Sequence, residues 1–457
     1  MAAGGARASG EGIPDLGTEA LGEGSAQIAS PQNMTAPWYN PAGLAGLSGP
    51  IIEIDLRLAW HRVGFQRLQA DGSNPHVWDP VNNNANITPL STVPTGGFAV
   101  PIRAMPFPFV ASLGGFPFNG ATGYQYPDPA ALQKNGLTPA QIEMAAPQRY
   151  SSILSSSKIY VAALGVAARP ISWLDLGANL QFVNASFGTR QSISSGITAG
   201  EYSEFDAALQ IAGHDFMRLS GAFGLTARLP WGLVFGASYQ LPYRFHATGT
   251  LTADIPPTLT SIGAKLSGSD ATLSFTFPWY FRAGLRLVRR VFEVELASTV
   301  DGWSTLDNIR IVPHNISIDL GTNSHTALPT LILPQQLQNA VSVRLGGELH
   351  VGELAPSVKG LTLRAGALYE TSAVPEQRQT LSLPNWARGS LSVGGSYDIG
   401  RFTLSAAWAH FIQPERDVRD STVKQTVALP GAAPTIIGNG NYTSDLDLFG
   451  CSVLMRF

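Results

Sequence analysis

About fourteen segments of this chain alternate apolar with polar residues, the pattern of a β-strand that buries one face. The first begins at residue 51 and reads IIEIDLRLAWHR, in which every second residue from Ile52 to Trp60 is apolar. Many segments run ten residues or more, the length that a tilted strand needs to cross a membrane. The pattern therefore predicts a large all-β protein.

The connections between these segments are short and long in turn. After most even-numbered segments the chain has only AMP, RPI, LPW, RR or DIGR, and a moderate GELAPSVKG follows the tenth. After odd-numbered segments the connections are long and polar, as at 68–90, 119–157, 247–273 and 311–336. Nothing in the fold of a soluble β-sandwich would make short and long connections alternate in this way. An outer-membrane barrel has an even strand count, with turns on the periplasmic side and loops outside.

Composition supports the membrane alternative. Charged residues make up 13% of the chain, against about 25% in soluble globular proteins. Gly, Pro, Ser and Asn interrupt every apolar run before the roughly 18 residues that a membrane helix requires. A closed barrel is the other structure that pairs all backbone groups inside a bilayer. We therefore predict a transmembrane antiparallel β-barrel of about 14 strands, located in the cell outer membrane.

The last segment offers two readings, an edge strand of a soluble sandwich or the closing strand of a barrel. In the barrel reading one wholly apolar face is turned to lipid, namely Phe449, Cys451, Val453, Met455 and Phe457. The opposite face carries Leu448 and Leu454 toward the lumen, where a water-filled pore would prefer polar groups.

Several classes of partner and chemistry find little support. A net charge of −3 gives no basic surface for nucleic acid, and one cysteine allows neither a disulfide nor a thiol metal cluster. The eight histidines form no metal-binding motif, so no metal and no cofactor are expected. His410 has no serine that can be placed beside it for lipid hydrolysis, so we expect no enzyme. The first 17 residues contain no apolar signal-peptide core, so an outer-membrane location requires that a signal was removed.

Residues 1–48 differ from the rest because they are rich in Gly and Ala and lack alternation. A barrel of fourteen strands is wide enough to enclose a plug. We predict that residues 1–48 form a hatch inside the lumen and that 49–457 form the barrel with its long extracellular loops. A disordered periplasmic tail is the alternative.

The sequence resembles the FadL family of outer-membrane transport proteins over nearly its whole length. The small-residue run LGTEALGEGSAQIA is followed by Asn40, Pro41 and Ala42, which is similar to the hatch and tripeptide of that family. The stretches FTFPWYFRAGL and LRAGALYETSAVPEQRQTLSLPNWARGSLSVGGSYDIG add to the resemblance. The terminal Phe457 resembles the signal read by the barrel-assembly machinery.

The resemblance implies uptake of long-chain fatty acids or related hydrophobic compounds through a lumenal pocket, with lateral release into the membrane at a kinked third strand. In this chain that strand reads FPFVASLGGFPFNG, and Gly114, Gly115 and Pro117 weaken its pairing. The alternative for these three residues is a simple strand end. A general diffusion porin and an aromatic-hydrocarbon channel are the alternative functions. The expected partners are a hydrophobic small molecule and outer-membrane lipid, and we expect a monomer.

Charged residues on the predicted lumenal faces are candidates for contact with a ligand head group or for stabilising the wall, and Arg364 and Arg388 are better read as structural supports. The candidates are Arg57, Arg282, Arg344, Glu348, Arg364, Glu370 and Arg388. Short helices are also expected in two long loops, around 128–146 and 201–213.

Overall fold

A computed structural model describes residues 15–29, 31–72, 84–87, 90–118, 122–125, 138, 143–144, 146–197, 201–320, 325–382, 384, 386–428 and 432–457. Within these ranges, no helix is long and apolar enough to cross a membrane.

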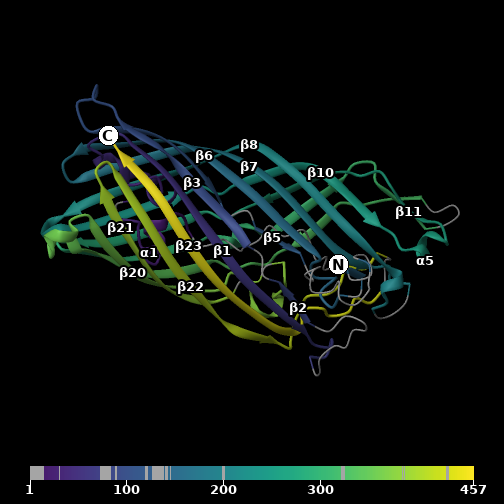
Figure 1. The fold of residues 1–457 in the computed structure, drawn as a ribbon. Helices are drawn as coiled ribbons and strands as arrows, with labels where there is room; N and C mark the ends of the chain where they lie inside the picture. Colours follow the sequence, from purple (N-terminus) through teal and green to yellow (C-terminus); the bar gives the residue numbers. More distant parts are fainter. Residues whose placement is uncertain are drawn as a thin grey trace.

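The described strands form one large antiparallel sheet whose first and last members pair, so that the sheet closes into a barrel (Figure 1). The closing ladder joins β1 (Ile51–Arg67) to β23 (Gly440–Arg456) in register along their whole lengths. Twenty described segments make fourteen wall strands, because six wall strands are each divided into two segments. The predicted 14-strand antiparallel barrel is confirmed.

The wall strands follow one another around the barrel in chain order. They are β1; β2 (Asn84–Ile87) with β3 (Leu90–Pro101); β4 (Phe109–Pro117) with β5 (Thr122–Gln125); β6 (Leu154–Ile171); β7 (Leu174–Ser194); β8 (Asp206–Leu229); β9 (Leu233–Gln240) with β10 (Arg244–Asp254); β12 (Asp270–Thr276) with β13 (Tyr280–Val288); β14 (Phe292–Asp301) with β15 (Asn308–Pro313); β18 (Leu331–Pro334) with β19 (Ala340–His350); β20 (Leu361–Glu370); β21 (Arg388–Ile399); β22 (Phe402–Val418); and β23.

Small elements complete the described chain. A separate three-stranded sheet contains β11 (Ala264–Ser267), β16 (Ser317–Leu320) and β17 (His325–Ala327). The helices are α1 (Thr18–Gly22), α2 (Ala36–Tyr39), α5 (Pro257–Thr260), η1 (Pro41–Gly46), η3 (Ser203–Phe205), η4 (Pro230–Gly232), η5 (Trp303–Thr305), η6 (Val351–Glu353), η7 (Pro356–Val358) and η8 (Glu376–Arg378).

The short connections all lie at one end of the barrel, which we call the turn end. They span 102–108, 172–173, 230–232, 289–291, 351–360 and 400–401. The first residue of β1 and the last residue of β23 pair with each other at this same end. The opposite end, the loop end, carries the long connections. The predicted separation of turns from loops is therefore confirmed.

Burial alternates along the wall strands with period two, as predicted. On β1 the side chains of Ile54 and Trp60 are 71% and 49% exposed, whereas those of Asp55 and Arg57 are 1% and 0% exposed. The apolar face therefore points outward to lipid and the charged face points into the lumen. β23 behaves the same way: Phe449 is exposed and Leu448 is fully buried.

Some predicted boundaries were wrong. The expected helix at 201–213 is instead the short η3 followed by the start of β8 at Asp206, because the barrel wall extends further toward the loop end than alternation suggested. The connections at 247–273 and 311–336 likewise contain strands, among them β10, β12 and β15. The helix expected around 128–146 lies almost entirely outside the described residues.

Candidate functional site

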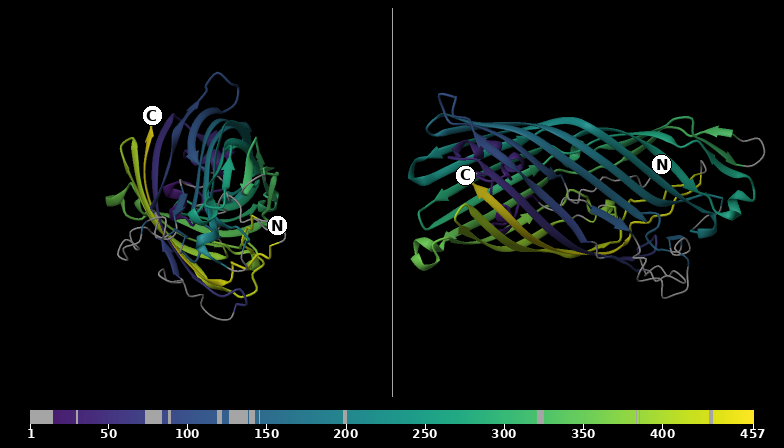
Figure 2. Two further views of the ribbon diagram at one scale, coloured as in Figure 1. Left: turned by 90° about the vertical axis from the view of Figure 1, so that its right-hand side faces the viewer. Right: turned by 45° about the horizontal axis from the view of Figure 1, so that its top comes forward.

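The N-terminal segment, here residues 15–48, lies inside the turn end of the barrel. The left view in Figure 2 looks along the barrel and shows the strands surrounding this segment, drawn in purple; the right view places it at the end where the chain terminates. Nearly all of its side chains are buried, including those of Leu21, Ile28 and Tyr39.

Carboxylates of the wall bind the backbone of this segment directly. Glu295 accepts hydrogen bonds from the N–H groups of Ile28 and Ala29 at 2.6 and 2.9 Å. Glu53 accepts one from Met34 N at 2.6 Å. Bonds with a charged acceptor are the stronger class, and they satisfy donors that a segment without regular pairing would otherwise leave buried and unpaired.

The Asn40-Pro41-Ala42 tripeptide packs against two wall glycines. Asn40 Nδ2 donates to the carbonyls of Ile28 and Leu225 at 3.0 and 2.9 Å, and Asn40 Oδ1 accepts from Ala42 N at 3.1 Å. A Cβ on Gly224 would meet Asn40 Oδ1, and one on Gly177 would meet the backbone of Pro41 and Ala42. Proline at the start of η1 fits because its missing N–H is not needed there.

A network of charges joins α1 to the wall. Arg286 lies within 3.0 Å of Glu23, 2.6 Å of Glu293 and 2.8 Å of Glu348. Arg364 lies 3.0 Å from Glu348 and 3.4 Å from Glu23. Burial raises the pKa of Glu23 from 4.5 to about 7, since desolvation and the neighbouring Glu348 outweigh the two arginines.

The other predicted lumenal charges, apart from Arg282, form three contacts. Arg57 donates to the backbone carbonyl of Asp15, and Arg344 forms an ion pair with the Asp15 carboxylate at 2.5 Å. Arg388 and Glu370 pair with each other at 3.1 Å across β20 and β21. Arg282 is the exception, because its guanidinium packs against rings, with Cζ 4.3 Å from the ring centroid of Trp38 and 4.9 Å from that of Tyr280.

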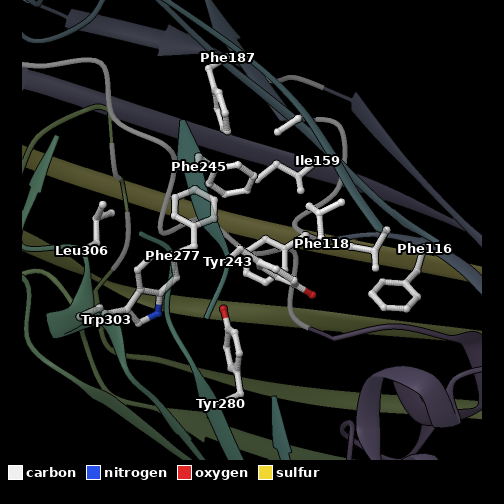
Figure 3. Close-up of a cluster of buried hydrophobic side chains, with 14 of the residues drawn as sticks. Phe116, Phe118, Ile159, Phe187, Tyr243, Phe245, Phe277, Tyr280, Trp303 and Leu306 are labelled. Carbon is white, nitrogen blue, oxygen red and sulfur yellow. The ribbon is translucent and has the colours of Figure 1, made fainter. Parts of the chain in front are cut away.

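A cluster of aromatic side chains fills the lumen beyond the N-terminal segment, and we call it the aromatic cluster (Figure 3). Ring centroids of neighbouring members lie between 4.9 and 6.4 Å apart, as for Phe118 with Tyr243 and Phe187 with Phe277. Such contacts add to the free energy of burying the rings. The cluster comprises Phe116, Phe118, Phe187, Tyr243, Phe245, Phe275, Phe277, Tyr280 and Trp303.

Several members of the aromatic cluster stand where a wall strand is interrupted. Tyr243 lies between β9 and β10, Phe277 between β12 and β13, and Trp303 between β14 and β15. Hydrogen bonds carry the wall across these breaks, as from Phe277 N to Tyr243 O at 2.8 Å. At these breaks the strand departs from regular β-geometry, so a side chain can turn into the lumen while hydrogen bonds keep the wall closed.

The wall differs between β3 and β4. Their ladder runs from Pro101↔Val110 to Gly96↔Gly115 and ends there, whereas β4 stays paired with β6 through Pro117. Among the described residues, nothing pairs with the β4-facing edge of β3 over 90–95. Gly115 faces outward and Gly114 faces the N-terminal segment, where a Cβ on Gly114 would meet the side chains of Pro37 and Met34. Phe118, just past Pro117, enters the aromatic cluster.

The candidates predicted from the sequence did not include Arg286 and Glu295, although both hold the N-terminal segment. Arg286 follows Arg282 by four positions and so shares its lumenal face, and Glu295 shares a face with Thr299 and Asp301. Period-two counting along these strands would have found both. Their partners on the N-terminal segment, such as Glu23, lie in a stretch without periodicity, so no sequence pattern indicated that they would contact the wall.

Among the described residues, two groups of acidic residues and histidine come close enough to suggest a metal. They are Glu293, Glu348 and His350, and His410, Asp445 and Asp447. Arginine already occupies the carboxylates of both groups: Arg286 in the first, and Arg62 in the second at 2.5 and 2.9 Å. A metal ion would have to displace those guanidinium groups.

Comparisons with known proteins agree with this architecture. The structure resembles a Pseudomonas aeruginosa FadL homologue with a TM-score of 0.75 and 16% identity, over 98% of this chain and 100% of that one. It resembles the Ralstonia pickettii toluene transporter TbuX (TM-score 0.63, 16% identity, 97% and 99% covered) and the Pseudomonas putida toluene transporter TodX (0.63, 15%, 98% and 100%). These identities show the fold alone.

No curated protein matches the sequence. A family model described as outer membrane protein transport protein (OMPP1/FadL/TodX) matches residues 174–457, which is more than half of the chain. Together with the closed 14-strand barrel, this match identifies the chain as an outer-membrane protein that belongs to the OMPP1/FadL/TodX family of transport proteins.

Proposed function

We propose that the barrel takes up hydrophobic compounds from outside the cell and releases them sideways into the outer membrane. In this proposal the turn end faces the periplasm and the N-terminal segment acts as a hatch that closes it. The ligand enters from the loop end, rests in the aromatic cluster and leaves through the wall beside β3.

The observation that carries the proposal is the position of Phe118. It follows directly on the strand segment whose ladder with β3 ends at Gly115, and its ring contacts Tyr243 and Phe277 inside the lumen. The interruption of the wall and the apolar interior are therefore adjacent along the chain. Hydrocarbon that left the cluster at this level would pass the edge of β3 and enter the lipid.

The buried N-terminal segment favours this function over that of a general diffusion porin. A porin needs a continuous aqueous path, whereas hydrogen bonds to Glu295 on β14 and to the Leu225 carbonyl on β8 hold the segment against the wall. The large aromatic cluster is likewise a poor lining for hydrated ions, because burying apolar surface there excludes water.

Uptake measurements in a Gram-negative host that lacks its own transporter of this class test the proposal. Expression of the chain should raise the initial uptake of radiolabelled dodecanoate or toluene several-fold, with no change for a radiolabelled sugar of similar mass. In planar bilayers the purified protein should pass no large steady current. Equal gains for the sugar, or a large steady current, would instead identify a diffusion porin.

A further inference from the structure

A row of basic and hydroxyl side chains crosses the outer surface of the barrel toward its loop end. Lys158 on β6 pairs with Ser186 on β7, and Ser186 pairs with His214 on β8. The row continues through Thr248 on β10 to Thr272 on β12. All members except the half-buried Thr272 are exposed, so the row lies on the outward face of the wall.

A second, shorter row lies directly beneath the first, nearer to the turn end. Its members are His246 on β10, Ser274 on β12 and Arg310 on β15, which pair in that order. Arg244 lies two residues from His246 on the same face of β10. We call the two rows and Arg244 the basic patch, and none of its members is acidic.

The cations of the basic patch have no carboxylate partner. Within the described part of the chain, Lys158, Arg244 and Arg310 are exposed and form no ion pair. Arg62 on the outward face of β1, by contrast, pairs with two aspartates of β23 at 2.5 and 2.9 Å. The basic patch therefore presents three uncompensated positive charges beside the wall.

The acidic residues around the basic patch are paired or lie further from the lipid. Asp215 is buried and pairs with Arg218 at 2.7 Å. Asp254 pairs with Arg190 at 2.8 Å. Asp270 begins β12 at its loop end. The charge next to the lipid is therefore positive on this side of the barrel.

The height of the basic patch places it at the boundary of the bilayer. Below Lys158, an apolar outward face of β6 begins at Tyr160 and ends at Ile171, and both side chains are exposed. A strand tilted by about 40° rises about 28 Å between them, close to the roughly 25 Å apolar band of outer-membrane barrels. Phe216 is likewise exposed just below His214. The patch therefore lies at the level of lipid head groups.

Phosphate is the head-group chemistry that the basic patch fits. Arginine binds phosphate through two parallel N–H donors, lysine attracts it as a point charge, and hydroxyl groups add neutral donors. The strands from β6 to β15 span about 24 Å, at about 4.8 Å for each step between neighbours. That breadth suits a lipid with several acyl chains and more than one phosphate better than a two-chain phospholipid.

We propose that the basic patch binds the phosphates of a multiply acylated glycolipid of the outer leaflet, whose chains pack on the apolar wall below it. The orientation, with the loop end outside the cell, comes from the proposed function. The site adds a lipid that the barrel holds on its outer surface, separate from the compound that passes through its lumen.

Binding of lipid A to the purified full-length protein in neutral detergent tests the site. Lipid A is a phosphorylated disaccharide with several acyl chains, and removal of its phosphates leaves the sugars and chains unchanged. Each Lys or Arg beside an anionic head group contributes about fivefold, so the wild-type protein should bind lipid A roughly 100-fold more tightly than the dephosphorylated form. Native mass spectrometry measures both affinities. A large excess of inorganic phosphate should not displace lipid A, because free phosphate brings no apolar chain.

Variants of the three exposed cations locate the preference. The triple variant Lys158→Gln, Arg244→Gln and Arg310→Gln should bind lipid A roughly 100-fold more weakly, with binding of the dephosphorylated form unchanged. The double variant Arg244→Lys and Arg310→Lys should retain most of the affinity, because the charges remain.

A second triple variant is the matched control. Lys359→Gln, Arg103→Gln and Arg401→Gln also remove one lysine and two arginines, here from exposed connections at the turn end. Net charge changes equally in the two triple variants. The control should bind lipid A like the wild-type protein.

Three results would overturn the lipid site. They are equal binding of both forms of lipid A by the wild-type protein, displacement by inorganic phosphate, and the same loss of affinity in both triple variants. The comparison of the two lipid forms needs no variant, so it decides the point even if a triple variant does not fold. None of these measurements involves uptake, so hydrophobic transport stands or falls separately.

Discussion

Glu295 in the wall holds Ile28 of the N-terminal segment by accepting its backbone N–H at 2.6 Å, and it accepts Ala29 N–H as well. The same carboxylate lies 3.4 Å from Arg286. A single wall residue thus connects the backbone of the segment to the charge network around α1.

Replacing Glu295 with alanine should loosen the N-terminal segment while the barrel remains folded. The variant loses two hydrogen bonds to a charged acceptor, and Arg286 loses one of its carboxylate partners. Together these losses should weaken docking of the segment by about 2–4 kcal/mol. Hydrogen exchange at Ile28 and Ala29 should accelerate by about 30-fold or more. Glu353→Ala, which removes an exposed pair with Arg290, is the control and should change nothing there. Unchanged protection in Glu295→Ala would contradict the assigned anchor.

Adding one methyl group beneath Asn40 should displace the tripeptide. The Cβ of Gly224→Ala would overlap Asn40 Oδ1 and approach Pro41 Cδ to 2.9 Å, so the segment must move. We expect faster cleavage of residues 15–48 by an added protease, with the folded barrel still resistant to unfolding in detergent. Gly389→Ala is matched, because its Cβ meets only Leu368 O at 3.7 Å, and it should behave like the wild-type protein. The same cleavage rate in both variants would argue against close packing at Gly224.

Docking of the N-terminal segment should weaken as the pH rises through neutrality. Burial raises the pKa of Glu23 from 4.5 to about 7, so the docked state binds more protons than the free segment between these values. The stabilising contribution is therefore complete below pH 4.5 and is lost as the pH rises through about 7, up to about 3 kcal/mol.

Hydrogen exchange of residues 16–29, corrected for the intrinsic rate at each pH, measures this dependence. The protection should fall between pH 5 and pH 8 in the wild-type protein, and Glu23→Gln should show a smaller slope. Protection that rises with pH, or an identical slope in Glu23→Gln, would show that Glu23 does not titrate in this range.

Much of the fold was predictable because a barrel wall has one strict requirement, alternation between a lipid face and a lumenal face. Ile54 and Trp60 faced outward as alternation required, and Glu53 and Arg57 faced inward. The short turns such as 172–173 stood out because little else separates two long strands. The end of β8 nearest the loops was less clear, since lipid no longer selects apolar residues there and alternation fades.

The interior was less predictable because it follows no period. Trp38 and Asp15 come from a stretch of sequence without periodicity, so nothing in their spacing placed them beside Arg282 or Arg344. The glycine and proline residues in FPFVASLGGFPFNG did indicate an irregular strand. They did not indicate that pairing ends toward β3 and persists toward β6, because that depends on neighbours distant in sequence.

Reversible closure of the β3–β4 edge tests lateral release most directly. Thr95 and Phe116 come directly after the last ladder pair, Gly96 and Gly115, on the side where pairing is absent. A disulfide between Thr95→Cys and Phe116→Cys, in a Cys451→Ser background that removes the native thiol, would fasten the two strands together there. The two single-cysteine variants serve as controls.

The decisive measurement is the uptake of radiolabelled dodecanoate and toluene by cells that express the double variant, before and after oxidation and again after reduction. If ligand leaves beside β3, oxidation should lower uptake several-fold, reduction should restore it, and the single variants should not respond. Unchanged uptake in cells in which mass spectrometry shows the disulfide to be formed would contradict lateral release at this position.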